Sequence, residues 1–379
     1  RGGLHMTQSA NRTALHHLLL ALLLAMAMIA AACGSSDDTA GSDDAASGGD
    51  SDTKAAFVMV APVGDAGWNF MHNEGRLGAE AATGVETAFV ENIPEGGAEF
   101  DNAVQQFIDD GYNVIFTTSF GYMDATEAFA ADNPDVVFEH VSGNKLNDTN
   151  FGNSFGRMYQ PRYIAGMAAG AATETNKIGY VAAFPIPEVI RGINAFTLGA
   201  QRVNPDVEVE VAWTATWFDP TVEGNTAQAL LDARADVLTM HQDSTATGQA
   251  ATDAGATFIG YHSDMSSQVA AYLTAPVWNW TERYSAVIEA AESGSYTPES
   301  WWGGMSDGVV DIDIPSSSPV AAEMQDVKDQ IIAGDFDVFE GEIVAQDGSI
   351  MVAAGEKLDD ESMLGMSTFV EGVIGSTDG

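Results

Sequence analysis

The stretch KAAFVMVAPVGDAGWNFMHNEGR, residues Lys54–Arg76, decides the fold of this chain. It starts with an apolar run typical of a buried β-strand, breaks at Pro62, and continues with helical spacing. A second copy of this pattern, KIGYVAAFPIPEVIRGINAF at Lys177–Phe196, breaks at Pro185. The copies begin roughly 120 residues apart, about the length of one domain. The repeat predicts an α/β fold with two lobes, each a parallel sheet flanked by helices.

Polar and aromatic side chains follow the first strand of each predicted lobe. Asp65, Trp68 and Asn69 come after this strand in the first lobe, and Phe184 and Glu188 come after it in the second. Ligands of open parallel sheets bind at the carboxyl ends of the strands. We therefore expect these five side chains to line a cleft shared by the two lobes.

The rest of the chain continues the alternation of strands and helices. We expect lobe one to hold residues 54–174 plus about 275–300, and lobe two to hold 175–274 plus much of 301–379. The predicted strands are 57–61, 86–91, 113–118, 136–142, 149–154, 177–184, 207–214, 237–241 and 256–261. The predicted helices are 68–82, 99–110, 163–173, 188–203, 222–232, 245–254, 281–293 and 320–332.

The N-terminal segment has the layout of an export signal. Arg12 precedes an apolar run whose core, Leu18–Ala32, is shorter than the roughly 20 residues that a spanning helix needs. The run ends in AAAC, which resembles a bacterial lipobox, so residues 1–32 are predicted to be a signal peptide and Cys33 the lipidated first residue of the mature protein. A simple transmembrane anchor with a free thiol is the alternative. With a single cysteine in the chain, no disulfide is expected.

The stretch after this cysteine cannot form a core. Residues 34–53 contain no aromatic or large aliphatic side chain, so residues 33–53 are predicted to be a lipidated cysteine followed by a disordered acidic tether. Such a tether would hold the lobes outside the cytoplasm, close to the cell membrane but not embedded in it.

The charge of the chain is strongly negative, at −41, with 55 acidic and 14 basic residues. Such a field repels nucleic acids and anionic membrane surfaces, so neither is an expected partner. The acidity favours a solubility adaptation, such as one to a saline habitat, over an attraction for cationic substrates.

Common catalytic and metal-binding patterns are absent from the sequence. It has no phosphate-binding G-x-x-x-x-G-K-[ST] loop, no dinucleotide G-x-G-x-x-G after a strand, and neither H-E-x-x-H nor G-x-S-x-G. The histidines after Cys33 are dispersed singly, which favours packing roles over metal ligation. Asp243 and Asp264 could serve as an acid and a base, but in a chain so rich in acids their pairing is more simply a coincidence. The sequence predicts no catalytic residues, no metal site and no cofactor.

Aromatic residues also stand just after predicted strands. This group contains Trp68, Phe120, Tyr122, Phe184 and Trp217. Core rings would be expected within strands, so the group favours a flat ligand stacked between aromatic rings, with its edge bound by Asn69, Asp243 and Asp264. The alternative is that each ring only fills the interface between the lobes.

Several motifs together resemble the basic membrane protein family, the PnrA-like lipoproteins that serve ABC importers of purine nucleosides and bases. These motifs are GDAGWNFMHNEGR (64–76), FPIPEVIRGINAFTLGAQRVNP (184–205), TWFDPTVE (216–223), YHSDM (261–265) and LTAPVWNW (273–280). The resemblance covers residues 54–375 and implies a periplasmic-binding-protein fold of type I, with three hinge crossings, that closes around its ligand. The resemblance also implies that the protein is a monomer and that its partners are the permease and ATPase subunits of an ABC importer.

The resemblance assigns roles to individual residues. Asp65, Trp68 and Asn69 would stack on and hydrogen-bond a purine base, Phe184 would stack from the other lobe, and Asp264 would hold ribose hydroxyls. Two positions depart from the nucleoside-binding pattern, since Trp278 stands where a lysine is usual and Ser142 where an aspartate is usual. Both departures remove polar anchors for a sugar, so we expect a free base such as adenine, with nucleosides second.

Two other functions share part of this pattern. A receptor domain that senses a small molecule would have the same lobes, anchor and tether, and adjacent permease and ATPase genes would distinguish transport from sensing. A nucleoside hydrolase using Asp243 and Asp264 would turn its ligand over, whereas a binding protein would not.

Overall fold

The computed structural model describes residues 52–378. The predicted signal peptide, Cys33 and nearly all of the predicted tether lie outside the described residues. Within residues 52–378, none of the helices has the length and apolar character needed to cross a membrane.

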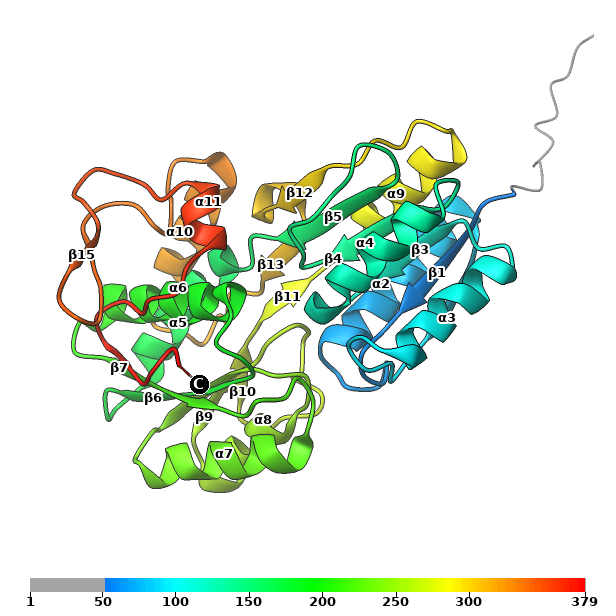
Figure 1. The fold of residues 1–379 in the computed structure, drawn as a ribbon. Coiled ribbons are helices and arrows are strands. Elements are labelled where there is room, and N and C mark those ends of the chain that lie inside the picture. The colour runs from blue at the N-terminus through cyan, green and yellow to red at the C-terminus, as the bar shows by residue number, and fades with distance from the viewer. Residues whose placement is uncertain (1–51, 379) are drawn as a thin grey trace, which may run out of the picture. The chain divides into compact units, whose positions relative to one another are not determined.

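The first lobe is built on a six-stranded parallel sheet with the strand order β12-β5-β4-β3-β1-β2 (Figure 1). The strands are β1 (Lys54–Val58), β2 (Glu86–Val90), β3 (Val114–Thr117), β4 (Val137–Val141), β5 (Phe151–Gly156) and β12 (Ser300–Gly303). Successive residues of β1 alternate between two hydrophobic clusters, with Phe57 on one face and Val58 on the other. Helices cover both faces of the sheet, so β1 and β3 are largely apolar on both faces, whereas β4 carries the buried polar side chains Glu139 and His140.

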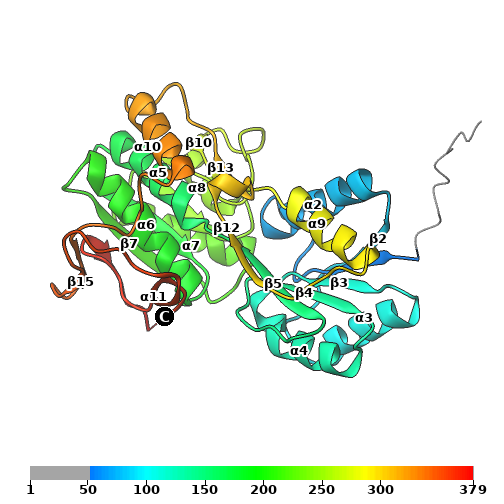
Figure 2. The same ribbon diagram turned by 90° about the horizontal axis from the view of Figure 1, so that it is seen from above.

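Two pairs of helices cover this sheet, one pair on each face (Figure 2). Helices α2 (Trp68–Thr83) and α9 (Thr281–Glu292) pack together on one face, and α3 (Ala98–Asp109) and α4 (Met123–Asp132) lie on the other. Helix α4 is not among the predicted helices, because it is short and has few large apolar residues to mark a helical period.

The second lobe repeats the architecture with the strand order β10-β9-β8-β6-β7-β16, again all parallel. The strands are β6 (Lys177–Ala182), β7 (Glu208–Trp213), β8 (Val237–His241), β9 (Thr257–Ile259), β10 (Tyr272–Thr274) and β16 (Val373–Ile374). The flanking helices are α5 (Tyr159–Ala172), α6 (Pro187–Val203), α7 (Pro220–Asp232) and α8 (Ala246–Ala254). Figure 1 shows α5 and α6 on one face of this sheet and α7 and α8 on the other. The predicted fold of two parallel sheets flanked by helices is confirmed.

The chain crosses between the lobes three times. It leaves the first sheet after β5, returns through β11 (Pro276–Trp278) to α9 and β12, and leaves again through β13 (Val310–Ile312). Strands β11 and β13 pair in antiparallel fashion, so two of the crossings form one ribbon. The residues after β13 include α10 (Ala321–Ala333), β14 (Ile343–Val344), β15 (Ile350–Val352) and α11 (Asp360–Leu364), and α10 and α11 pack against α5 and α6.

Helix α5 lies in a different lobe from the one expected. The sequence boundary at residue 174 would leave it in the first lobe, but it packs against α6 and α10 of the second. The two helices meet backbone to backbone, because a Cβ on Gly166 would lie 2.0 Å from the Phe196 carbonyl oxygen and one on Gly199 1.9 Å from that of Tyr163. Such close packing is possible only with glycine at these positions. The first crossing therefore precedes α5.

Candidate functional site

The candidate site is a small cavity between the two lobes. Its walls come equally from both lobes, with Val60, Trp68, Ser119, Phe120 and Ser142 from the first and Glu188, Trp217, His241, Asp243 and His262 from the second. All of these residues lie at or beyond the carboxyl ends of strands or in the helix starts that follow them.

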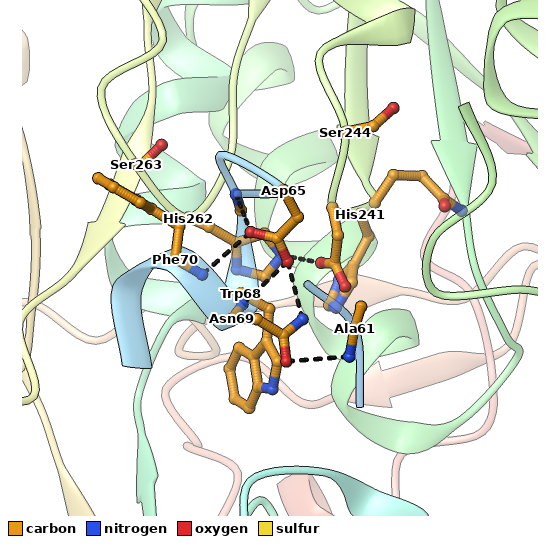
Figure 3. Close-up of polar contacts among 12 residues, drawn as sticks. Ala61, Asp65, Trp68, Asn69, Phe70, His241, Ser244, His262 and Ser263 are labelled. Atoms are coloured by element: carbon orange, nitrogen blue, oxygen red, sulfur yellow. Dashed lines mark hydrogen bonds and ion pairs between the residues drawn. The ribbon is translucent and has the colours of Figure 1, made fainter. Parts of the chain in front are cut away.

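The loop before α2 is organised by Asp65 (Figure 3). Its Oδ1 accepts hydrogen bonds from the backbone N–H groups of Gly67 and Phe70, and its Oδ2 accepts from the backbone and side-chain nitrogens of Asn69. The Asn69 Oδ1 in turn accepts from the Ala61 N–H at 3.3 Å. A carboxylate that satisfies the free N–H groups of a first helical turn fixes where the helix begins. Asp65 and Asn69 therefore position Trp68 but do not line the cavity.

Trp68 is held from two sides. Its indole Nε1 donates a hydrogen bond of 2.6 Å to the Thr118 carbonyl oxygen at the end of β3. Its ring makes edge contacts with His262 and Trp278, at centroid distances of 5.7 and 5.5 Å. An indole fixed in this way presents a rigid aromatic surface to a ligand without further loss of rotamer freedom.

A buried carboxylate and a histidine from the second lobe stand beside this ring. The His262 Nε2 lies 3.1 Å from Asp243 Oδ1, while its Nδ1 accepts a hydrogen bond of 3.0 Å from the Trp278 indole. Because Nδ1 is the acceptor, the ring proton of neutral His262 is assigned to Nε2, which faces Asp243. Burial lowers the pKa of His262 well below its usual value, so the ring is neutral.

The carboxyl groups at the site have raised pKa values. Burial raises the pKa of Asp243 to about 8, opposed by a hydrogen bond from the Trp68 backbone N–H. Burial also raises the pKa of Glu188 to about 7, opposed by the charge of Arg191. For Asp65, burial and the neighbouring Asp243 carboxylate raise the pKa to about 7. These groups can therefore change protonation near neutral pH when a ligand arrives.

Aromatic rings from both lobes contribute to the cavity. Phe120 comes from the first lobe and Trp217 from the second, and the Phe184 ring packs edge-on against Trp217 at a centroid distance of 4.9 Å. The Trp217 indole Nε1 is buried and has no acceptor among the described residues. Phe184 thus supports Trp217 from behind, and Trp217 keeps a buried donor available for a ligand.

Two residues of the cavity wall have an unusual backbone conformation. Ser142 and His262 have φ angles of 75° and 71°, in the left-handed region that side-chain-bearing residues seldom adopt. Residues held in this conformation cluster at ligand sites, where the surrounding structure enforces it.

The structure brings half of the predicted site residues together at the cavity: Trp68, Phe120, Ser142, Glu188, Trp217 and Asp243. Tyr122 instead lies in the core of the first lobe, where its ring stacks on Phe100 and its hydroxyl donates to the Ile93 carbonyl oxygen. Asp264 is exposed and accepts from the Ser266 N–H, which closes a turn. Trp278 is buried in the hinge ribbon and stacks on Trp280.

Four cavity residues are not among the predicted ones: Val60, Ser119, His241 and His262. The two histidines are expected from the sequence to be packing residues because they stand alone in it. The missed signal is position, since all four lie at or just beyond the end of a strand.

The cavity can bind a small polar or planar molecule. Its carboxyl groups accept hydrogen bonds when ionised, its serines and indole donate, and its rings offer stacking faces. Residues 52–378 contain no cluster of three or more His, Cys, Asp or Glu side chains placed to hold a metal ion.

Comparison with known proteins identifies the family. The model for Bmp, described as ABC transporter substrate-binding protein PnrA-like, matches residues 52–345. The chain belongs to the Bmp family. As an ABC transporter substrate-binding protein, this Bmp protein is of a type that works outside the cytoplasm with permease and ATPase components.

Two relatives of this Bmp protein are similar over most of their length. A protein of Haloferax volcanii assigned as an ABC transporter glucose-binding protein is 41% identical over 326 residues, covering 85% of this chain and 80% of its own. A purine-binding protein of Brucella abortus is 40% identical over 325 residues, covering 84% of this chain and 92% of its own.

Solved structures support the fold. A solute-binding protein of an ABC transporter system from Aeropyrum pernix superposes with a TM-score of 0.65 at 18% identity, covering 75% of this chain and 92% of its own. A protein of the same description from Conexibacter woesei gives a TM-score of 0.62 at 18% identity, covering 75% and 98%.

Proposed function

We propose that this Bmp protein captures a purine base, adenine-like, or a purine nucleoside in the cavity between its lobes and delivers it to an ABC importer. The observation that carries the proposal is the cavity wall, where aromatic rings from both lobes surround a small space with buried carboxyl groups. Stacking on a planar ring and accepting from its N–H groups are the two interactions that such a base offers. The similarity to a purine-binding protein agrees with this choice.

A free base is preferred to a nucleoside for a local reason. Ser142 lines the cavity with a short side chain, and the Trp278 indole is already bonded to His262. Neither position supplies the charged anchor that a ribose would need to satisfy its buried hydroxyls. The proposed contacts are therefore stacking on Trp68, Phe120 and Trp217 and hydrogen bonds to Glu188 and Asp243.

Glucose is a second candidate, because the Haloferax volcanii relative is assigned to that sugar. The carboxylates of Glu188 and Asp243 could accept from sugar hydroxyls while an aromatic face covers the ring. This candidate does not use the flatness of a purine, so the two ligands are separable by direct binding.

The test is calorimetric titration with adenine, guanine, adenosine, guanosine, uracil and glucose, with each mixture analysed afterwards for hydrolysis. Tight binding of adenine without turnover is the expected result. Clearly tighter binding of adenosine would overturn the preference for a free base, and glucose binding with silent purines would establish the second candidate. Release of a free base from a nucleoside would favour the hydrolase alternative.

We further propose that Cys33 is lipidated and anchors the protein to the cell membrane, on the basis of the AAAC sequence that ends its apolar segment. Replacing Cys33 with serine should move the protein from the membrane fraction to the soluble fraction. Deleting an adjacent permease gene should abolish uptake of the ligand if the protein serves transport, whereas a sensor would leave uptake intact.

A further inference from the structure

A second, smaller cavity adjoins the ligand cavity. The two cavities share Glu188 and His241 as lining residues. The rest of the second cavity, which we call the inner chamber, is lined by residues that include Arg162, Arg191, Gly192 and Tyr261. No step of the proposed ligand binding uses these residues.

Arg162 of helix α5 is the main polar feature of the inner chamber. Its side chain is fully buried, and none of its three guanidinium nitrogens has a hydrogen-bond partner among the described residues. Its Cζ lies 3.5 Å from the centroid of the Tyr261 ring and 5.5 Å from that of Tyr180, so its protein contacts are mainly with aromatic faces. The direct interaction of Arg162 with the Tyr261 hydroxyl has the smallest effect of those that shift the pKa of Tyr261.

Further unpartnered groups surround the same space. The Tyr180 hydroxyl and the Nδ1 of His241 are buried and have no hydrogen-bond partner within residues 52–378. A Cβ added to Gly192 would lie 3.8 Å from the Arg162 Nε and 3.9 Å from the Tyr180 hydroxyl. The glycine thus leaves open a space to which the guanidinium and the phenol are both adjacent. Buried donors without acceptors are costly, so a site that collects them points to a missing acceptor.

The charges around the inner chamber do not balance. Arg191 is also buried; its Nη1 donates to the Met363 carbonyl oxygen at 2.7 Å, and within the described chain neither it nor Arg162 forms an ion pair. Most other basic side chains described are ion-paired with a carboxylate, as expected in so acidic a protein. Glu188 is the one carboxyl group that lines the inner chamber. Buried charges need a partner, and here two cations share a single acid.

We propose that the inner chamber binds a small inorganic anion, of the size of chloride, against the Arg162 guanidinium and the Tyr180 hydroxyl. The anion supplies the acceptor that these donors lack and the counter-charge that Arg162 lacks. The site is separate from the ligand-binding surfaces of Trp68 and Trp217, so the proposal does not depend on which molecule occupies the ligand cavity.

The experiment measures the melting temperature of the ligand-free full-length chain in chloride and in gluconate at the same ionic strength. Screening of surface charge is equal in the two salts, and gluconate is much larger than chloride. We expect chloride to raise the melting temperature of the wild-type protein by roughly 3–6 °C relative to gluconate. Arg162→Met should lose this difference and, in gluconate, should be at least as stable as the wild type, since it removes an unpaired buried charge.

Arg202→Met is the matched control, because Arg202 lies on the same lobe but pairs with Glu323 at the surface. It should keep the chloride response. An equal response in Arg162→Met and the wild type would overturn the proposal. So would a wild type indifferent to chloride whose affinity for the cavity ligand falls in Arg162→Met, because the inner chamber would then belong to the ligand site. Should Arg162→Met not fold, bromide-soaked wild-type crystals decide: an anomalous peak at the guanidinium supports the proposal and its absence contradicts it.

Discussion

Asp243 is a residue at which the two lobes meet. The carboxyl group comes from the second lobe, accepts a hydrogen bond from the Trp68 backbone N–H of the first, and faces the Nε2 of His262 at 3.1 Å. The Asp65 carboxyl group lies close enough that the charge of Asp243 raises its pKa. Two carboxyl groups so close disfavour each other's ionisation, and burial adds to this effect.

The raised pKa of Asp243 makes ligand binding depend on pH. An N–H donor on the ligand needs the ionised carboxylate, and with a pKa of about 8 this form becomes scarce as the pH falls below 8. We expect affinity for the purine to weaken by as much as about fiftyfold between pH 8 and pH 6, because the ionised fraction of Asp243 falls from about one half to about one hundredth. Calorimetric titrations at several pH values measure this. Glu188, with a pKa of about 7, titrates in the same interval and acts in the same direction.

Asp243→Asn is the control for this effect, since the amide has nearly the same shape but does not titrate. Its binding should be weaker at pH 8 and less dependent on pH than that of the wild type. Stability moves the opposite way: the folded pKa of Asp243 exceeds the unfolded value, so its stabilising contribution is complete below about pH 4 and is lost as the pH rises through 8. The ligand-free variant should therefore melt higher than the wild type at pH 8. Identical pH profiles for the two proteins would exclude Asp243 as the titrating group.

Trp68→Ala tests the stacking surface. We expect it to weaken purine binding by about 1–3 kcal/mol, the range for removing an aromatic platform under a base. Trp213→Ala is the control, because Trp213 lies on β7 with its indole bonded to the Ser376 carbonyl oxygen, away from the cavity. A dissociation constant unchanged by the loss of Trp68 would remove this residue from the site.

At the scale of elements, the contact between α5 and α6 fixes the first crossing. A Cβ at position 166 would lie 2.0 Å from a backbone oxygen of α6, so Gly166→Ala should push the helices apart and destabilise the protein by about 2–3 kcal/mol. Gly224→Ala on α7 is the matched control. The nearest neighbour of a Cβ there is 3.8 Å away, and alanine favours a helix, so the variant should be neutral or slightly stabilising. Denaturant unfolding of both variants gives the comparison, and equal stabilities would mean that the helices can separate freely.

Elements with local signals could be predicted from the sequence. Apolar runs and helical spacing predict the order of strands and helices in both lobes, because those patterns depend on neighbouring residues. The lobe of α5 could not be predicted, since it follows from glycines that meet another helix. Strand β12 joins β5, and β16 joins β7, only through long-range pairing.

Part of the candidate site could also be predicted from local patterns in the sequence. Trp68, Phe120 and Ser142 follow strands, and the rule that ligands bind at strand ends finds them. Tyr122 obeys the same rule but lies within a short 3-10 helix that turns its ring into the core. His262 was missed because its role depends on Asp243 and Trp278, which contact it in the structure but are distant in the sequence, so no local pattern encodes the arrangement.

At the scale of the whole molecule, the net charge of −41 opposes folding by self-repulsion. Salt screens this repulsion, as the Debye length falls from about 10 Å at 0.1 M to about 3 Å at 1 M. The melting temperature should therefore rise over this range even in gluconate, where a chloride site plays no part. A melting temperature independent of gluconate concentration would show that the acidic residues are too far apart to repel each other appreciably.

The closed arrangement of the lobes depends on the absence of a side chain at Gly67. A Cβ there would lie 2.6 Å from the Asp243 carbonyl oxygen, across the interface between the lobes, where the Ser263 hydroxyl also donates to the Ala66 carbonyl oxygen. Gly67→Ala should hold the lobes apart. Because ligand binding stabilises the closed state, a penalty on closure lowers the apparent affinity, and we expect a loss on the order of tenfold.

Gly64→Ala lies in the same loop and is the matched control, since a Cβ at that position meets nothing within 4 Å. Small-angle scattering with saturating ligand should show a larger radius of gyration for Gly67→Ala than for the wild type or Gly64→Ala. Comparable melting temperatures of the ligand-free proteins would confirm that each lobe remains folded. If Gly67→Ala closed fully and bound its ligand with wild-type affinity, the close approach of Gly67 to Asp243 would not limit closure of the lobes.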